Sequence, residues 1–161
     1  MVKQELSDTA GGNLDLLPRG VKPELDWPAV QELVQRLGRI CRAQIGDADA
    51  IVGISRGGWI PARLLAEHLG IKRLYSMGLQ YSDSKRTTLE TYQFPHIENS
   101  RVILIEDATE SGRALDYGRK VLEPKNNFVL TASLLVKKGG PFPSQAFCDE
   151  VDVVPRFPWE I

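Results

Sequence analysis

The feature that most constrains this 161-residue chain is a pattern that occurs twice: a short apolar run, a glycine-containing polar turn, and a helical stretch. The first copy joins residues 50–54 to a helix at residues 59–69, and the second joins residues 101–105 to a helix at residues 113–122. Parallel strands need crossover connections of this kind, because a tight turn cannot join them. The pattern therefore predicts an α/β domain with a doubly wound, mainly parallel sheet.

A further helix is expected after Asp26, whose side chain can cap a first helical turn. Apolar residues follow at helical spacing, so one face of this helix should pack against the core. The residues of that face are Val30, Leu33, Val34, Leu37, Ile40 and Cys41.

The remaining strands are expected at residues 74–79, 128–136 and 151–154, which brings the sheet to about five strands. The polar segment from Tyr81 to His96 is long for a mere connection and is interpreted as a loop over a site. A chain of 161 residues can bury one core but is short for two ordinary domains. We therefore expect a single domain covering residues 1–161.

Composition narrows the possible functions. The 20 basic and 21 acidic residues give a net charge of -1, which provides no broad footprint for nucleic acid or an anionic membrane. Cys41 and Cys148 form no metal-binding or disulfide pattern. No apolar run approaches the roughly 20 residues of a membrane span, and the start of the chain lacks a secretory apolar region. These features predict a cytoplasmic protein that binds neither nucleic acid nor membranes.

Adjacent carboxylates stand where the strand at residues 101–105 ends. Side chains of neighbouring residues diverge at a strand end, so Glu106 and Asp107 can accept hydrogen bonds from different hydroxyls, as in a vicinal diol, or approach a hydrated Mg²⁺. The loop that follows can turn backbone N–H groups and the Ser111 hydroxyl toward an anion at a helix N-terminus, with Gly112 allowing close approach. Together these residues indicate a pair suited to a vicinal diol, followed by a phosphate-binding loop.

This stretch resembles the phosphoribosyl pyrophosphate signature of type I phosphoribosyltransferases, in which an apolar strand, two acidic residues and a Thr/Ser-Gly loop follow one another. The resemblance implies that fold, with a small hood made by the chain termini: an N-terminal arm at residues 1–25 and a C-terminal hood segment at residues 139–161. It implies that Glu106 and Asp107 hold the ribose hydroxyls, with Asp107 also near Mg²⁺. The implied 5′-phosphate loop is Ala108, Thr109, Glu110, Ser111, Gly112, Arg113 and Ala114, and Ala114 stands where the family usually has Thr or Ser.

The earlier turn resembles the pyrophosphate loop of the same family. Its residues are Ser55, Arg56, Gly57 and Gly58, and the guanidinium of Arg56 offers a planar, permanent charge to the leaving group. An ordinary turn between a strand and a helix is the alternative interpretation of this motif.

Residues 26–161 most resemble the xanthine-guanine and archaeal purine members of that family. Lys137 matches a lysine that donates to the purine 6-oxo group, and Glu110 matches an acidic residue that acts near purine N7. Val154 stands at the position of a base-stacking aromatic residue. Trp159 matches a family aromatic near the C-terminus, and we expect it to seal the core rather than contact the base. Without the resemblance, Lys137 is an exposed strand-end lysine and Glu110 a favourable charge on a helix dipole.

The resemblance implies a Mg²⁺-dependent purine salvage enzyme that transfers phosphoribosyl to guanine, xanthine or hypoxanthine and releases pyrophosphate. Its partners would be phosphoribosyl pyrophosphate, the purine base and the nucleoside monophosphate, and it would form a homodimer or homotetramer. Two alternatives stay open. One is a regulatory protein of the same fold that senses nucleotides and binds RNA, and the other is a transferase for a different base.

Overall fold

The sheet of the computed structural model has six strands in the order β3-β2-β1-β4-β5-β6, and the structure describes residues 22–85, 89–141 and 144–160. The five strands β2, β1, β4, β5 and β6 are parallel to one another. Strand β3 pairs antiparallel with β2 and forms one side edge of the sheet. Along the chain the elements are α1 (Trp27–Ile45), β1 (Ala50–Ser55), α2 (Trp59–Leu69), β2 (Arg73–Tyr81), β3 (Leu89–Gln93), β4 (Arg101–Thr109), α3 (Arg113–Leu122), a 3₁₀ turn (Glu123–Lys125), β5 (Phe128–Lys137) and β6 (Ala146–Val151).

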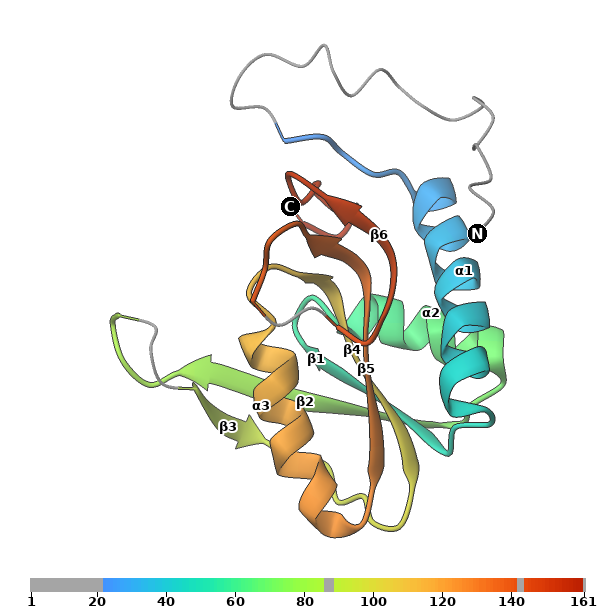
Figure 1. Cartoon of the computed structure of the whole chain (residues 1–161), viewed down its shortest axis with the longest axis vertical. Helices are drawn as coiled ribbons and strands as arrows, with labels where there is room; N and C mark the ends of the chain where they lie inside the picture. The colour runs from blue at the N-terminus through green and yellow to red at the C-terminus, as the bar shows by residue number, and fades with distance from the viewer. Residues whose placement is uncertain (1–21, 86–88, 142–143, 161) are drawn as a thin grey trace.

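Helices cover both faces of this sheet, as the sequence pattern predicts. Figure 1 shows α1 and α2 on one side and α3 on the other. Successive strand residues point to opposite faces, so Ile103 and Ile105 of β4 pack under α1 and α2 while Val102 and Leu104 pack under α3. Two buried layers therefore hold the central strands and fix where they end.

All three predicted helices are present, with both expected bounds for α2 and α3 and the expected start for α1. Asp26 caps α1 by accepting a hydrogen bond from the Ala29 N–H at 2.9 Å. Gly70 ends α2 in the left-handed conformation at φ 71°, which glycine adopts at little cost. The predicted apolar face of α1 is buried at Val30, Leu33, Val34, Leu37 and Cys41, and Ile40 packs partly buried beside it.

The prediction was wrong for the last strand, which covers residues 146–151 and not 151–154. The valine-rich segment 151–154 leads into Pro155, which has no N–H to donate to a ladder. Strand β6 is a partly buried edge strand whose polar residues hide its pattern. The segment from Tyr81 to His96, predicted as a loop, contains β3, which makes the sixth strand. Its alternating, exposed residues pair with an extended β2 in a hairpin that projects beyond the sheet (Figure 1).

The two ends of the described part of the chain pair with each other. The Leu25 N–H donates to the Arg156 carbonyl at 2.9 Å, and the Arg156 N–H donates to the Pro23 carbonyl at 2.7 Å. From here on, the hood means residues 22–26 and 152–160, which are narrower than the expected arm and hood segment. Figure 1 shows both segments at the same end of the molecule. Most of the predicted N-terminal arm, residues 1–21, lies outside the described residues. Across the described part of the chain, no helix is long and apolar enough to span a membrane.

The packing of α1 predicts a large stability difference between two leucines. Leu37 is fully buried in α1, whereas Leu74 on β2 is 37% exposed. Leu37→Ala should lower the free energy of unfolding by about 2–5 kcal/mol, because it leaves a cavity in the core. The matched change Leu74→Ala should cost less than about 1 kcal/mol. Urea denaturation measures both, and equal losses would contradict the assigned core.

Candidate functional site

The two glycine-containing turns of the sequence meet at one edge of the sheet. Strands β1 and β4 are parallel neighbours, with Gly53 opposite Ile105, so both end at the same edge. The backbone of Gly58 packs against the Ile105 carbonyl, and Gly57 packs against the Asp107 side chain so tightly that an added Cβ would lie 2.8 Å from its carboxyl carbon. Glycine is required here for close approach. The turn after β1 and the carboxylates of β4 therefore form one site.

Asp107 is held in place by two donors. Its Oδ1 accepts the Ala108 N–H at 2.7 Å, and its Oδ2 accepts the Trp159 indole N–H at 3.2 Å. Burial raises the pKa of the Asp107 carboxyl, and these two hydrogen bonds oppose that rise. The side chain is thus oriented before any ligand arrives.

Glu106 has a more strongly shifted pKa. Burial, and then the negative charge of Asp107, raise the pKa of Glu106 to about 8. Its strand position lies opposite Ser133 of β5. A ligand hydroxyl at this position would meet a carboxyl group that exchanges its proton near neutral pH.

The start of α3 has the features of an anion site. Gly112 caps α3 with φ 76° and no side-chain cap, so the positive end of the helix dipole faces this turn. The Ser111 Oγ accepts the Arg113 N–H at 3.4 Å, which keeps the hydroxyl at this turn. Thr109 Oγ1 is buried and has no hydrogen-bond partner among the described residues. Such an orphaned hydroxyl is costly unless a ligand or water satisfies it.

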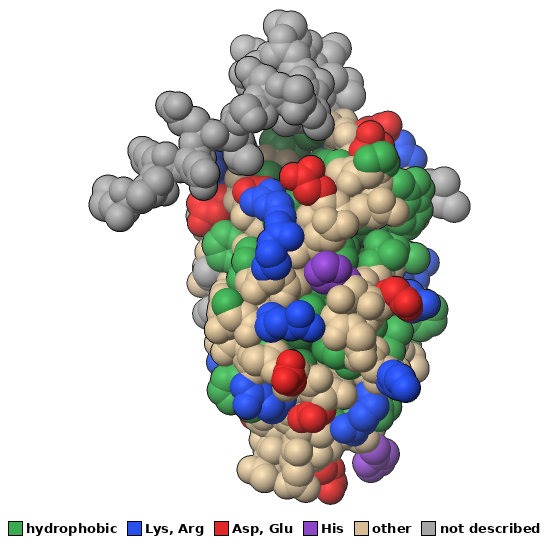
Figure 2. Space-filling view, turned by 90° about the vertical axis from the view of Figure 1, so that its right-hand side faces the viewer, with side chains coloured by type: hydrophobic (Ala, Val, Ile, Leu, Met, Phe, Trp, Pro, Cys, Tyr) green, Lys and Arg blue, Asp and Glu red, His purple; other side chains and the backbone are tan. Residues whose placement is uncertain are grey.

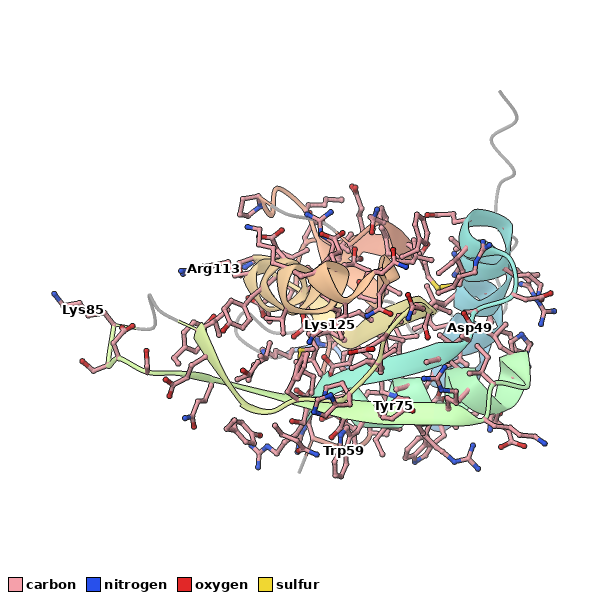
Figure 3. The ribbon with its side chains drawn as sticks, turned by 90° about the horizontal axis from the view of Figure 1, so that it is seen from below. Asp49, Trp59, Tyr75, Lys85, Arg113 and Lys125 are labelled. Carbon is pink, nitrogen blue, oxygen red and sulfur yellow. The ribbon has the colours of Figure 1, made fainter. Side chains whose placement is uncertain are left out.

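The remaining residues of the predicted phosphate loop frame this turn. Ala108 is partly buried against the core on the α1 side, and Ala114 packs against the core beneath α3. Arg113 is exposed and lies at the start of α3 (Figure 3). The loop therefore offers backbone donors and the hydroxyls of Thr109 and Ser111, but no hydroxyl at residue 114.

The structure also brings Glu110 and Lys137 together. The Lys137 Nζ lies 3.9 Å from Glu110 Oε2, and both side chains are about half exposed. The backbone of Gly140 packs against the Glu110 carbonyl, so the turn after β5 adjoins the loop before α3. Val154 packs partly buried against the core on the α1 side.

At the turn after β1, Ser55 and Arg56 differ in their surroundings. Ser55 Oγ donates to the Met77 carbonyl at 3.3 Å and also lies 3.3 Å from the Tyr92 hydroxyl of β3. Arg56 is exposed, and its peptide bond with Ser55 is cis. The contact between Tyr92 and Ser55 ties the hairpin of β2 and β3 to this turn. Lys85 lies near the tip of that hairpin (Figure 3).

Sequence reasoning missed Tyr92 and the contact of Trp159 with Asp107. The available signal was the pair Thr91 and Tyr92, because both residue types are common in strands. No local signal links Trp159 to Asp107, because 52 residues separate them.

A hollow lies at the other end of the parallel strands, where β1 and β2 begin. It has a volume of about 420 Å³, and its lining includes Arg42, Asp49, Lys72 and Arg73. Asp49, labelled in Figure 3, accepts the Arg101 N–H at 2.7 Å. Its walls mix both charges and contain none of the residues predicted from the sequence motifs.

Residues 25–161 match the family model of the phosphoribosyl transferase domain, and the chain belongs to this family. The fold agrees with that assignment, since a mostly parallel six-stranded sheet carries the acidic pair and the glycine turns at one edge.

Within the family, the chain is similar to proteins acting on different bases. It is 26% identical over 119 residues to a xanthine-guanine phosphoribosyltransferase of Cereibacter sphaeroides, covering 70% of this chain and 69% of that protein. It is 28% identical over 127 residues to an orotate phosphoribosyltransferase of Porphyromonas gingivalis, covering 76% of this chain but only 58% of that protein. A purine phosphoribosyltransferase of Pyrococcus horikoshii has the same fold, with a TM-score of 0.78 at 22% identity over 87% of this chain and 94% of that one.

The pKa of Glu106 predicts how stability depends on pH in the ligand-free protein. The folded carboxyl keeps its proton up to about pH 8, whereas the unfolded carboxyl loses it near 4.5. Between these values the folded protein binds more protons, so the free energy of unfolding falls as the pH rises. Glu106→Gln cannot ionise and should remove this fall.

Urea denaturation at several pH values across that window measures the effect. Exposed Glu98 provides the control, and Glu98→Gln should keep the wild-type slope. Parallel curves for wild type and Glu106→Gln would show that Glu106 is not protonated by burial.

Proposed function

We propose that this chain is a purine phosphoribosyltransferase, which transfers phosphoribosyl from phosphoribosyl pyrophosphate to a 6-oxopurine and releases pyrophosphate. The observation that carries the proposal is the contact of Gly57 with the Asp107 carboxylate. It brings a glycine turn suited to pyrophosphate beside a pair of carboxyl groups suited to ribose. The start of α3, which suits a phosphate, directly follows that pair in the chain.

In this proposal the sugar phosphate occupies the end of β4. Glu106 and Asp107 accept hydrogen bonds from the ribose 2′- and 3′-hydroxyls. The 5′-phosphate lies in the loop from Ala108 to Ala114, where the helix N-terminus and the Thr109 and Ser111 hydroxyls can bind it. The unsatisfied Thr109 Oγ1 supports this placement, because a phosphate oxygen would accept its hydrogen bond.

The donors at the site fit Mg²⁺ carried by the substrate. Mg²⁺ is commonly held by one or two carboxylates together with substrate phosphates and water. Asp107 offers such a carboxylate, and the described residues contain no group of three acidic, His or Cys side chains that could form a complete cage. Asp107 would hold the ion, which when bound would offset negative charge on the pyrophosphate.

The reaction is a displacement at ribose C1. The bond from C1 to the pyrophosphate oxygen breaks and takes its electron pair to the leaving group, while a purine nitrogen donates a pair to C1. Positive charge builds on the sugar between these events, so fixed charges and exclusion of water matter most. Arg56 would stabilise the leaving pyrophosphate, and the β2–β3 hairpin, tied to Ser55 through Tyr92, would limit water.

Base recognition is assigned to the Lys137 side of the site. Lys137 would donate to the 6-oxo group, and Glu110 would accept or stabilise a proton near purine N7. Their separation of 3.9 Å supports a shared task. Val154 would contribute apolar contact with the base in place of an aromatic ring. A homodimer or homotetramer remains a prediction from the family resemblance, and a cytoplasmic location remains a prediction from the sequence.

The regulatory, RNA-binding alternative has less support. The net charge is -1, and Figure 2 shows a face on which basic side chains are interspersed with acidic, hydrophobic and uncharged ones. Arg36 on α1 is paired with Asp149 at 2.8 Å, which reduces its availability to phosphates of RNA.

Product formation tests the proposed function. The protein is incubated with Mg²⁺, phosphoribosyl pyrophosphate and each of guanine, xanthine, hypoxanthine, adenine, uracil and orotate, and nucleotides are quantified by chromatography. The proposal expects nucleoside monophosphates from the oxopurines. Product from orotate alone would establish a transferase for another base, and no product from any base would refute the enzymatic role.

Lys137 should distinguish 6-oxopurines from adenine. An ammonium group donates to a carbonyl but meets another donor at a 6-amino group. Lys137→Ala should lower kcat/KM for the preferred oxopurine by roughly tenfold to a hundredfold, on the scale of one charge-assisted hydrogen bond. The affinity for phosphoribosyl pyrophosphate should stay nearly unchanged.

Steady-state kinetics with every base, alongside titration of phosphoribosyl pyrophosphate, measures this prediction. The neighbouring Lys138, which is paired with Asp152 at 3.2 Å, provides the matched control Lys138→Ala. Equal losses for adenine and oxopurines would indicate a general electrostatic role. A loss seen only in Lys138→Ala would show that Lys138, and not Lys137, contacts the base.

A further inference from the structure

The Asp107 carboxylate receives its second hydrogen bond from the far end of the chain. Trp159 Nε1 donates to Asp107 Oδ2 at 3.2 Å, while the adjacent Ala108 N–H donates to Oδ1 at 2.7 Å. The backbone donor can restrain one oxygen only. The indole N–H therefore fixes the rotation of the carboxyl group about its last bond, and it faces the oxygen that Gly57 also packs against.

The Trp159 ring is itself fixed by aromatic neighbours. It stacks on Phe157 with ring centres 4.8 Å apart and planes 15° apart, and it meets Trp27 at 5.8 Å. Phe157 is buried, with only 2% of its surface exposed. An indole held between two rings loses little further freedom when its N–H forms a hydrogen bond.

The hood supplies a rigid frame for these rings. Arg156 pairs through its backbone with Pro23 and Leu25. Its guanidinium Nε donates to the Glu160 carbonyl at 2.9 Å, and the Phe157 N–H donates to the Glu160 carboxylate at 2.8 Å. The C-terminal segment is therefore closed on itself and tied to the start of α1, next to Trp27. The hood thereby holds the Trp159 ring in a fixed orientation beside Asp107 at the end of β4.

We propose that Trp159 is a positioning residue, which orients Asp107 for the ribose hydroxyls of phosphoribosyl pyrophosphate. The inference rests on the proposed function, because it assigns Asp107 to the sugar. Each oxygen of Asp107 then has one lone pair engaged by the protein and another directed to a ligand. Orienting the group in advance lowers the ordering cost of binding, so the benefit falls on the affinity for the sugar phosphate.

The role differs from simple sealing of the core, and one substitution separates the two. Trp159→Phe keeps an aromatic ring against Phe157 and Trp27 but removes the indole N–H. Trp27→Phe makes the same exchange in the neighbouring ring, which is 48% exposed and forms no hydrogen bond with Asp107 in the described structure. A sealing role predicts comparable effects of the two changes, whereas a positioning role concentrates the effect at Trp159.

Calorimetric titration of phosphoribosyl pyrophosphate with Mg²⁺ into wild type and both variants provides the test. Trp159→Phe should raise the Kd by about tenfold, the scale of one hydrogen bond to a charged group. Trp27→Phe should stay within about twofold of wild type. The KM for the purine base should be unchanged in both variants, because the contact concerns the sugar. Thermal unfolding verifies that each variant is folded.

If Trp159→Phe does not fold, Trp159 is replaced by benzothienylalanine, which keeps two fused rings and exchanges the N–H for sulfur. A wild-type Kd after loss of the N–H would overturn the positioning role. Equal weakening by Trp27→Phe and Trp159→Phe would also overturn it, in favour of ring packing. Absence of binding to wild type would instead refute the proposed function itself, so the two failures are distinguishable.

Discussion

The close approach of the turn after β1 to β4 is the contact on which the geometry of the site depends. Gly58 lies against the Ile105 carbonyl and Gly57 against the Asp107 carboxylate, and neither position has room for a Cβ. Parallel pairing brings two strand ends to one edge, but only glycine lets the two turns touch. If the turns were held apart, the carboxylates and the Arg56 turn would bind separate ligands. Their contact makes one continuous surface, on which the proposed function places a single sugar with phosphates at both ends.

The packing of the turn after β1 against β4 also bears on the raised pKa values of Glu106 and Asp107. Glu106 and Asp107 are adjacent and largely shielded, so the pKa of each carboxyl is raised by burial, and that of Glu106 to about 8. The protein offsets this cost at Asp107 with two N–H donors, one of them from Trp159. A cation or a set of hydroxyl donors would stabilise both carboxylates further. These electrostatics support the proposed function, in which a polyhydroxylated ligand with an associated metal ion occupies the site.

Local patterns could predict what depends on neighbours in the chain, and failed where distant segments meet. Helices α2 and α3 begin and end as expected, and α1 begins as expected, because periodic apolar residues and capping residues act locally. The acidic pair and the turn at Gly112 were likewise predictable, since they are contiguous. Strand β6 was predicted too late in the chain. Its own residues are only partly buried and include polar ones, so they lack a clear apolar pattern, whereas the valines just before Pro155 looked more like a strand. The contacts of Tyr92 with Ser55 and of Trp159 with Asp107 arise from tertiary packing, which no spacing in the sequence encodes.

A crystal structure of the protein with Mg²⁺ and phosphoribosyl pyrophosphate tests most directly whether the two turns form one site. The account predicts the 5′-phosphate at the start of α3, the ribose hydroxyls on Glu106 and Asp107, and the pyrophosphate along residues 55–58. Ligand density in the hollow beside Arg42 and Lys72, or a bound sugar that does not contact Asp107, would contradict it.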